Sequence, residues 1–114
     1  MRLGIISEPE WENRAAIVPN SIKKLKKAGF DVFVESGAGL KSYYSDSQYI
    51  DAGAIICDRS DSMSCEIIIT INMLEKNNLR NGMILACMAD PFRNPISLKN
   101  CLESGVTLFS MDMI

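Results

Sequence analysis

Short apolar segments of strand length alternate with helical patterns along the whole sequence. The apolar segments comprise residues 2–6, 30–35, 54–57, 67–71, 83–88 and 106–110. Helical signals separate them, with proline near the start of 19–27 and 95–103 and glycine shortly after each, at Gly29 and Gly105. Because alternation predicts parallel pairing and parallel crossovers are right-handed, we expect a doubly wound, mainly parallel α/β sheet of about six strands, three-layered and flavodoxin-like or Rossmann-like.

Weaker helix and turn signals fill the remaining connections. Ser45 and Asp46 are typical N-cap residues and predict a short helix at 47–52, which Gly53 ends. Shorter helix or turn signals occupy 58–64, 75–79 and Asn81-Gly82.

The segment at 67–71 indicates the middle of the sheet. It is β-branched with little alternation, which is typical of a strand buried on both faces. The chain has 114 residues and neither an internal repeat nor a linker. We therefore expect a single α/β domain spanning residues 1–114.

The charge distribution argues against a nucleic-acid partner. Formal net charge is −2, whereas a nucleic-acid footprint needs a basic patch. The lysine cluster at 23–27 is interpreted as the solvated face of a helix, because Ile22, Leu25 and Ala28 take the other positions. No segment approaches the ~20 apolar residues of a membrane span, and the N-terminus has no secretory pattern. We expect a soluble, cytosol-type polypeptide.

Histidine is absent, and the cysteines form no metal-type pair. The four cysteines are Cys57, Cys65, Cys87 and Cys101, without a CxxC spacing. We interpret them as buried reduced thiols and expect no metal. The absence of histidine removes Ser-His and Cys-His nucleophile pairs and the commonest general acid or base.

The segment after the first strand is long and charged. It carries Trp11, Arg14 and three glutamates, Glu8, Glu10 and Glu12. In an α/β unit this segment faces the ligand crevice, and a bare connection needs only about 2–6 residues. It is either a working loop or a solvated loop with Trp11 on the surface.

Gly37 and Gly39 form a Gly-x-Gly sequence after the second strand. A dinucleotide fingerprint needs a third glycine and a helix directly after the first strand. The third position here is Ser42. We interpret the sequence as a turn with positive φ and predict no dinucleotide site in this chain.

Three polar residues are candidates for contact with a ligand. Arg14 has the guanidinium that matches a carboxylate bidentately, and its alternative is an ion pair with a glutamate of its own segment. Asn72, with Thr70, ends the buried strand, and Asp90 follows the next one. A ligand between Arg14, Asn72 and Asp90 is geometrically sensible. The alternative for Asn72 and Asp90 is helix or turn capping.

Several stretches, read together, resemble one family. They are Gly4-Ile5, Glu12-Asn13-Arg14-Ala15-Ala16 with Pro19, Val34-Glu35-Ser36-Gly37-Ala38-Gly39, Ala52-Gly53-Ala54, Glu66-Ile67-Ile68, Ile71-Asn72, Asn94-Pro95, Gly105-Val106-Thr107 and Met111-Asp112. The set resembles the N-terminal domain shared by alanine dehydrogenase and the α subunit of proton-translocating NAD(P) transhydrogenase. The resemblance covers essentially the whole chain.

The two branches of this family differ at the candidate residues. In alanine dehydrogenase, the resemblance implies that Arg14 would bind the substrate carboxylate, that a substrate-binding lysine would fall at Asn72, and that the catalytic histidine would fall at about Asp90. Both the lysine and the histidine are missing here, so the proton step of oxidative deamination has no evident agent. The stretches that look more like the transhydrogenase α subunit are Ile71-Asn72, Asn94-Pro95 and 110–114.

The resemblance implies an oxidoreductase role shared with other components. This lobe would belong to the NAD(H)-binding component of a transhydrogenase, which passes a hydride from NADH to NADP⁺ while protons cross a membrane component. NAD(H) would be bound mainly by a nucleotide-binding lobe that lies outside this chain, so we expect no catalytic and no cofactor-binding residue here. The expected partners are that lobe, the membrane and NADP-binding components and, in the full enzyme, a second copy in a homodimer.

Two alternatives stay open beside this expectation. One is a lobe of an alanine-dehydrogenase-like amino-acid dehydrogenase, and the other is a free-standing, non-catalytic domain that binds a partner. If the transhydrogenase reading holds, the chain is a truncated or split form that is inactive alone. It would lie on the cytoplasmic or matrix side, peripheral to a membrane through its partner subunits.

Overall fold

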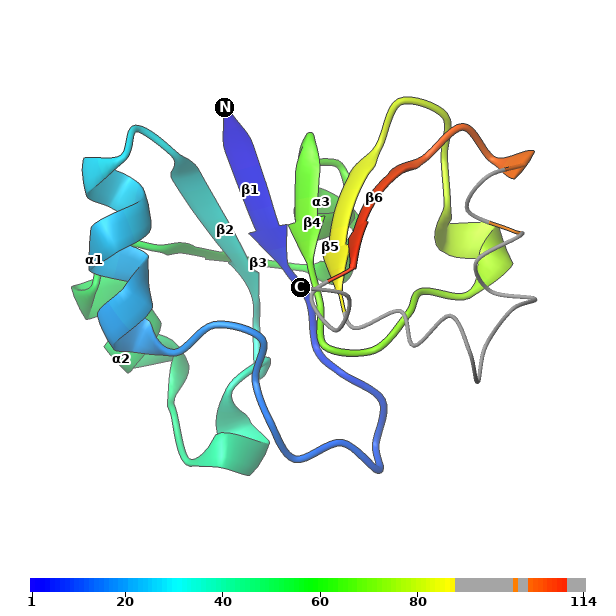
Figure 1. Cartoon of the computed structure of the whole chain (residues 1–114). Helices are drawn as coiled ribbons and strands as arrows, with labels where there is room; N and C mark the ends of the chain where they lie inside the picture. The colour runs from blue at the N-terminus through cyan, green and yellow to red at the C-terminus, as the bar shows by residue number, and fades with distance from the viewer. Residues whose placement is uncertain (88–99, 101–102, 111–114) are drawn as a thin grey trace.

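All six described strands pair in parallel in one sheet in the computed structural model of the chain (Figure 1). The structure describes residues 1–87, 100 and 103–110. The strands are β1 (Arg2–Ile5), β2 (Asp31–Glu35), β3 (Ile55–Cys57), β4 (Ile67–Ile69), β5 (Ile84–Cys87) and β6 (Thr107–Ser110). Their order is β3-β2-β1-β4-β5-β6. The predicted fold class is confirmed, with the Rossmann-like rather than the flavodoxin-like order.

Between β1 and β5, the part of the chain that the structure describes without a gap, three α-helices and two 3-10 turns connect the strands. They are α1 (Pro19–Lys27), α2 (Asp46–Asp51), α3 (Arg59–Met63), η1 (Leu40–Ser42) and η2 (Lys76–Asn78). The caps explain the helix boundaries. Ser45 and Gln48 form a reciprocal capping box at the start of α2, and the Asp58 side chain caps α3. After α1 and α2, Gly29 and Gly53 have φ of +98° and +107°.

Two helix predictions need correction or fall outside the structure. The helix expected at 75–79 is only the 3-10 turn η2, which contains Asn77 and Asn78, a residue type with low helix propensity. The 3-10 turn η1 was not expected from the sequence. The helix expected at 95–103 lies almost wholly outside the described residues.

Side chains alternate between the two faces of the sheet, and helices cover both. On one face, Leu3 and Ile5 of β1 pack in a buried cluster with Ile22 of α1 and Tyr49 of α2. On the other face, Ile68 of β4 belongs to a second cluster against which α3 packs. Figure 1 shows α1 and α2 together on one side of the sheet and α3 behind β4 and β5.

Gly4 lets α3 lie directly against the first strand. A Cβ atom added at this position would be 2.1 Å from the carbonyl oxygen of Ser62 and 3.0 Å from the side chain of Ile68. Gly4 pairs with Ile68 in the register of β1 and β4. The glycine is therefore required by close backbone approach at the centre of the sheet.

β1 and β4 are neighbours, although β2 and β3 lie between them in sequence. Chain connections leave β1 toward β2 on one side and return to β4 on the other. In open α/β sheets this reversal point opens a crevice at the carboxyl ends of the strands, where ligands bind. The segments leaving β1 and β4 therefore form the candidate site.

The lysine-rich helix α1 is amphipathic, as expected. Ile22 is fully buried and Leu25 is half-buried, while the lysines are exposed. Ala28, placed on the apolar face by its spacing, is exposed because α1 ends at Lys27. Among the described residues, no helix has the length and apolar character needed to cross a membrane.

Candidate functional site

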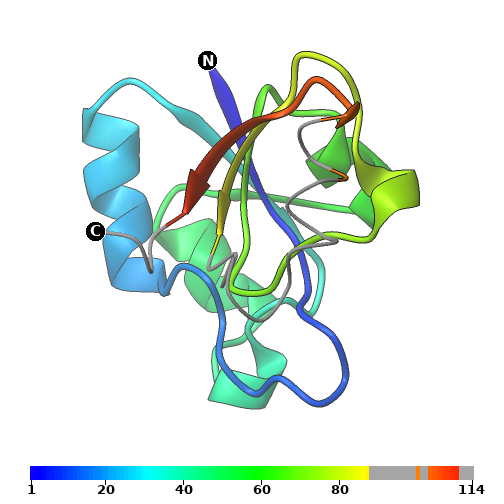
Figure 2. The ribbon, with the colours of Figure 1, turned by 45° about the vertical axis from the view of Figure 1, so that its right-hand side comes forward.

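The connection from β1 to α1 runs beneath the carboxyl ends of the strands and is held by η1. The ammonium of Lys41 donates hydrogen bonds to the carbonyls of Pro9 and Glu10, at 3.3 and 2.5 Å. The hydroxyl of Ser42 donates to the carbonyl of Asn13 at 2.5 Å. Figure 1 and Figure 2 both show this connection beside the segment that contains η1. The long segment is therefore fixed on the domain by specific contacts.

Glu8 joins the end of β1 to the end of β4. Its carboxylate accepts hydrogen bonds from the backbone N–H groups of Ile71 and Asn72, both at 3.0 Å. The side-chain amide of Asn72 donates a third bond, at 3.2 Å. Two consecutive N–H groups directed at one anion form the kind of concavity that binds phosphates and carboxylates elsewhere. In this chain its own glutamate fills that concavity.

Glu12 forms a second carboxylate centre beside the first. It is buried, and the guanidinium of Arg14 donates to its two oxygens, with both distances 3.0 Å. The amide of Asn72 donates to the same carboxylate at 3.1 Å. The hydrogen bond from Arg14, followed by that from Asn72, lowers the pKa of Glu12 from 4.5 to about 2. Glu12 is therefore a fixed negative charge at neutral pH.

A third carboxylate, that of Glu35, lies at the carboxyl end of β2. Glu35, the last residue of β2, accepts hydrogen bonds from the backbone of Ser7 and from the guanidinium of Arg59, both at 3.2 Å. Arg59 also donates to the carbonyl of Ser7 at 3.5 Å. The carboxyl edge of the sheet thus carries three glutamates whose partners are backbone N–H groups, one amide and two arginines.

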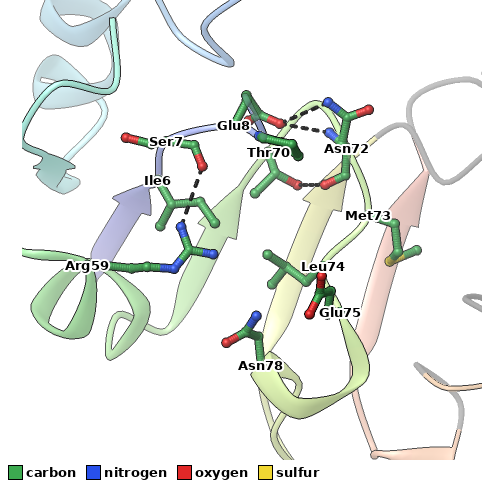
Figure 3. A pocket seen from close by; sticks show the side chains of 11 residues that line it. Ile6, Ser7, Glu8, Arg59, Thr70, Asn72, Met73, Leu74, Glu75 and Asn78 are labelled. Carbon is green, nitrogen blue, oxygen red and sulfur yellow. Dashed lines mark hydrogen bonds between the residues drawn. The ribbon is translucent and has the colours of Figure 1, made fainter. Parts of the chain in front are cut away.

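A cavity of about 330 Å³ opens between the exits of β1 and β4 (Figure 3). Polar groups of Glu8, Thr70 and Asn72 lie along one side and Arg59 along another, with Leu74 between them. This volume is in the range of small-molecule sites. A smaller hollow of about 120 Å³ lies on the other side of Glu8, next to Glu12 and Arg14. Glu8 borders both spaces.

The structure places two of the three predicted site residues together. Arg14 and Asn72 meet at the Glu12 carboxylate, and the Arg14 side chain is 63% exposed. The alternative expected for Arg14, an ion pair within its own segment, is what the structure contains. The side-chain amide of Asn72 donates to two glutamates of another segment, Glu8 and Glu12. Asp90 lies outside the described residues, and ligand contact by any of the three stays a prediction.

Glu8 and Glu12 are the residues that sequence reasoning missed. Both were treated only as partners for Arg14. A usable signal was present, because Glu8 lies shortly after the first strand in a segment with few cations, and a carboxylate there needs backbone donors. Trp11, in the same segment, is 72% exposed, so it lies on the surface as the solvated-loop alternative expects, and a working role of this loop stays a prediction.

The Gly-x-Gly sequence is a turn, as expected, but its two glycines serve different purposes. Gly37 has φ of +85°, and its N–H donates to the Asp46 carboxylate at 2.9 Å. Gly39 does not have positive φ, which corrects that part of the expectation. A Cβ atom there would lie 2.6 Å from the ring of Tyr49. This turn therefore packs against α2 and donates a hydrogen bond to Asp46, the first residue of that helix.

The thiols are buried to different extents. Cys65 and Cys87 are fully buried, whereas Cys57 is only half-buried and its sulfur lies 3.0 Å from the hydroxyl of Ser62. Cys101 lies outside the described residues. Within the described part of the chain, no group of three histidine, cysteine or acidic side chains is arranged to hold a metal ion.

We expect Glu12→Gln to lower the free energy of unfolding by about 1 kcal/mol at pH 7, since it loses charge-assisted bonds to an exposed arginine. The folded-state pKa of about 2 lies below the ordinary 4.5. The stabilisation by Glu12 is therefore complete above about pH 4.5 and is lost as pH falls toward 2. Urea denaturation at pH 7, 5 and 3 should show the gap between wild type and variant narrowing with acid.

Glu10→Gln is the matched control, because the Glu10 side chain is fully exposed and its carboxylate lies 3.4 Å from the ammonium of Lys41. Its stability should follow that of the wild type at each pH. A Glu12→Gln gap that stayed constant from pH 7 to pH 3 would contradict the assignment of Glu12 as a carboxylate held ionised by Arg14 and Asn72.

Strand order, parallel pairing and polar groups gathered at the exits of β1 and β4 define a Rossmann-like α/β domain with its site in the switch-point crevice. Comparison with known families then places the chain more narrowly. It belongs to the alanine dehydrogenase/PNT N-terminal domain family, whose model matches residues 4–114.

Individual relatives come from both branches. NAD(P) transhydrogenase subunit alpha of Cereibacter sphaeroides is 32% identical over 110 residues, covering 92% of this chain and 21% of that protein. Alanine dehydrogenase of Bilophila wadsworthia is 32% identical over 111 residues, covering 93% and 29%. The crystal structure of transhydrogenase from Sinorhizobium meliloti superimposes with a TM-score of 0.93 at 31% identity, covering all of this chain and 36% of that one. The chain thus spans between a fifth and just over a third of these relatives.

Proposed function

We propose that this chain is the N-terminal lobe of the NAD(H)-binding component of a proton-translocating NAD(P) transhydrogenase. It would form one wall of the cleft in which a hydride passes from NADH to NADP⁺. Family membership and 32% identity to a transhydrogenase α subunit support this proposal. The observation that carries it is the state of the switch point, where Glu8 occupies the anion-binding backbone groups.

The residues at this crevice do not fit the pyrophosphate of a dinucleotide. A Rossmann nucleotide site needs glycines and unoccupied N–H groups after the first strand. Here the four residues after the first strand, 6–9, include no glycine and end in Glu8 and Pro9, and proline has no N–H to donate. While Glu8 occupies these donors, its carboxylate and that of Glu12 would also repel the pyrophosphate. We infer that a second lobe grips NAD(H), while this lobe orients the nucleotide and excludes water.

The partners follow from this role. The proposed assembly contains the nucleotide-binding lobe, the membrane and NADP-binding components that couple hydride transfer to proton movement, and a second copy of the NAD(H)-binding component. The chain would then work on the cytoplasmic or matrix side of the membrane. On its own it is expected to be inactive.

Nucleotide binding and turnover test the proposal. NADH titrated into the isolated chain, followed by NADH fluorescence, should give no saturable signal up to about 1 mM. Hydride transfer to NADP⁺ should appear only when a nucleotide-binding lobe and the membrane and NADP-binding components of a related transhydrogenase are added. Saturable binding of NADH by this chain alone at micromolar concentration would overturn the proposal.

An alanine-dehydrogenase-like lobe is the second candidate. It is supported by 32% identity to an alanine dehydrogenase and by the 63% exposure of the Arg14 side chain, which could meet a substrate carboxylate. Against it, Asn72 supplies an amide rather than a cation and is already bonded to Glu8 and Glu12. With the nucleotide-binding lobe added, pyruvate- and ammonia-dependent oxidation of NADH that is lost in Arg14→Ala would favour this candidate. Its absence favours the transhydrogenase.

A further inference from the structure

Three hydrogen-bond donors in the crevice converge on one carboxylate, that of Glu8. They are the backbone N–H groups of Ile71 and Asn72 and the side-chain amide of Asn72, at 3.0, 3.0 and 3.2 Å from the Glu8 carboxylate. The two backbone donors contact different oxygens of the same carboxylate, which is bidentate recognition. We call these three donors the anion slot.

We propose that the anion slot is a binding site for the carboxylate or phosphate group of a ligand, and that Glu8 is its exchangeable internal occupant. A ligand entering through the 330 Å³ cavity would take the three hydrogen bonds that Glu8 now accepts. This inference concerns the chain's own donors and does not depend on the transhydrogenase assignment.

The donors of the slot are held by the sheet, whereas its occupant is one side chain of the β1–α1 connection. The N–H of Thr70 bonds to the carbonyl of Ala86 on β5 at 3.0 Å, and its hydroxyl donates to the carbonyl of Asn72 at 2.8 Å. These bonds orient the slot on the sheet. Glu8 is half-exposed and lies outside any regular element. Among the described residues, no salt bridge within 4.0 Å fixes its carboxylate.

The charges in the crevice contribute to the cost of exchange. Glu12 already has its own cation, since both its oxygens are bound by Arg14. Glu8, which occupies the slot next to Glu12, also interacts electrostatically with Arg14. A ligand anion in the slot displaces Glu8, which remains tethered and charged, so binding adds one negative charge to a crevice that Arg14 and Arg59 border. The cost of binding is therefore this added charge together with the competition from a tethered group, whose effective concentration is in the millimolar range or above.

The competition predicts how Glu8→Ala behaves. Removing the tethered carboxylate leaves three donors without an acceptor, and a free anion should then bind at least about ten-fold more tightly than it does to the wild type. The probes are sodium acetate, for a carboxylate source, and sodium phosphate, for a phosphate source, with chloride balancing ionic strength. The readout is the backbone amide resonances of Ile71 and Asn72 during titration.

Two further variants make the test specific. Glu10→Ala removes the same charge from the same loop without touching the slot, so its affinity for both probes should equal that of the wild type. Glu8→Ala combined with Asn72→Asp replaces a donor by a carboxylate and should abolish the gain. Saturation by acetate alone identifies a carboxylate ligand, whereas saturation by phosphate as well identifies a site that also accepts phosphate.

The proposal can still be tested if the Glu8→Ala variant does not fold. If Glu8→Ala is unfolded, acetate or phosphate should restore its native spectrum in a saturable manner. Glu8→Gln keeps one acceptor, and the same probes should raise its thermal unfolding midpoint. Amide resonances, or a thermal midpoint, that respond to acetate and phosphate no more than to chloride would overturn the proposal. Glu8 would then be a permanent clamp between β1 and β4.

Discussion

Replacing Gly4 with alanine should lower the free energy of unfolding by about 3 kcal/mol, at the upper end of the usual cost of overpacking. The added methyl group would lie 2.1 Å from the carbonyl oxygen of Ser62, which belongs to the backbone of α3 and cannot rotate away. α3 must therefore shift off the first strand, and the buried Ser62 and Ile68 lose their packing. Urea denaturation monitored by circular dichroism measures the loss.

Gly29→Ala is the matched comparison for this substitution. Gly29 has φ of +98°, but nothing lies within 4 Å of an added Cβ atom. This variant isolates the penalty of a left-handed backbone and should cost about 1 kcal/mol. Gly4→Ala costing no more than Gly29→Ala would show that α3 does not lie against β1 as described.

Tyr49→Ala should destabilise the domain by about 3–5 kcal/mol, as expected for loss of a buried aromatic side chain. Tyr49 is fully buried between α2 and the sheet, and its hydroxyl donates to the carbonyl of Ile17 at 2.8 Å. Its ring packs edge-on against Tyr44, and it fills the space that Gly39 leaves. Removing it opens a cavity and releases the connection between β1 and α1. Thermal and urea unfolding at pH 7 provide the measurement.

Tyr49→Phe separates the ring from its hydroxyl. Burial raises the pKa of Tyr49 to about 12, so the hydroxyl remains a donor throughout the neutral range. The phenylalanine variant loses one hydrogen bond and should cost about 1 kcal/mol. If the alanine and phenylalanine variants were equally stable, the buried position of the ring would be wrong.

The elements of this fold were predictable because their signals are local. Ser45 with Gln48 marks the start of α2, and Gly53 marks its end, within a few residues of sequence. The β-branched run that became β4 likewise needs no distant information, although the strand ends at Ile69 rather than at Ile71. Alternation of such elements was sufficient to predict the parallel, doubly wound class.

The site was less predictable because it depends on which strands are neighbours. Arg14 and Asn72 were selected for their chemistry, and the structure brings them together at Glu12. That Glu8 would meet Ile71 and Asn72 requires β1 to lie beside β4, which local patterns do not determine. An anion slot made of backbone N–H groups also leaves no signature in side-chain identity, since every residue except proline has that group.

The close approach at Gly4 has the same origin. A glycine within a strand indicates a bulge or a near neighbour, but the sequence does not say which neighbour. Tyr49 was similarly inconspicuous, because one aromatic residue in a six-residue helix gives no clear periodicity. Both positions acquire their importance only from tertiary packing.

The placement of β1 beside β4 has a consequence for how the chain reaches its native state. Leu3, Gly4 and Ile5 find their partners on one side at 32–34, but their partners on the other side are Ile67, Ile68 and Ile69. During synthesis, β1, β2 and β3 can pair with one another while the other edge of β1 is still unpaired. Pairing of β1 with β4 requires closing the long chain segment between them, and closure of such segments slows the folding of proteins dominated by contacts distant in sequence. β1 is synthesised before the other five described strands but is therefore among the last to be completed, because its edge toward β4 stays unpaired until β4 has left the ribosome.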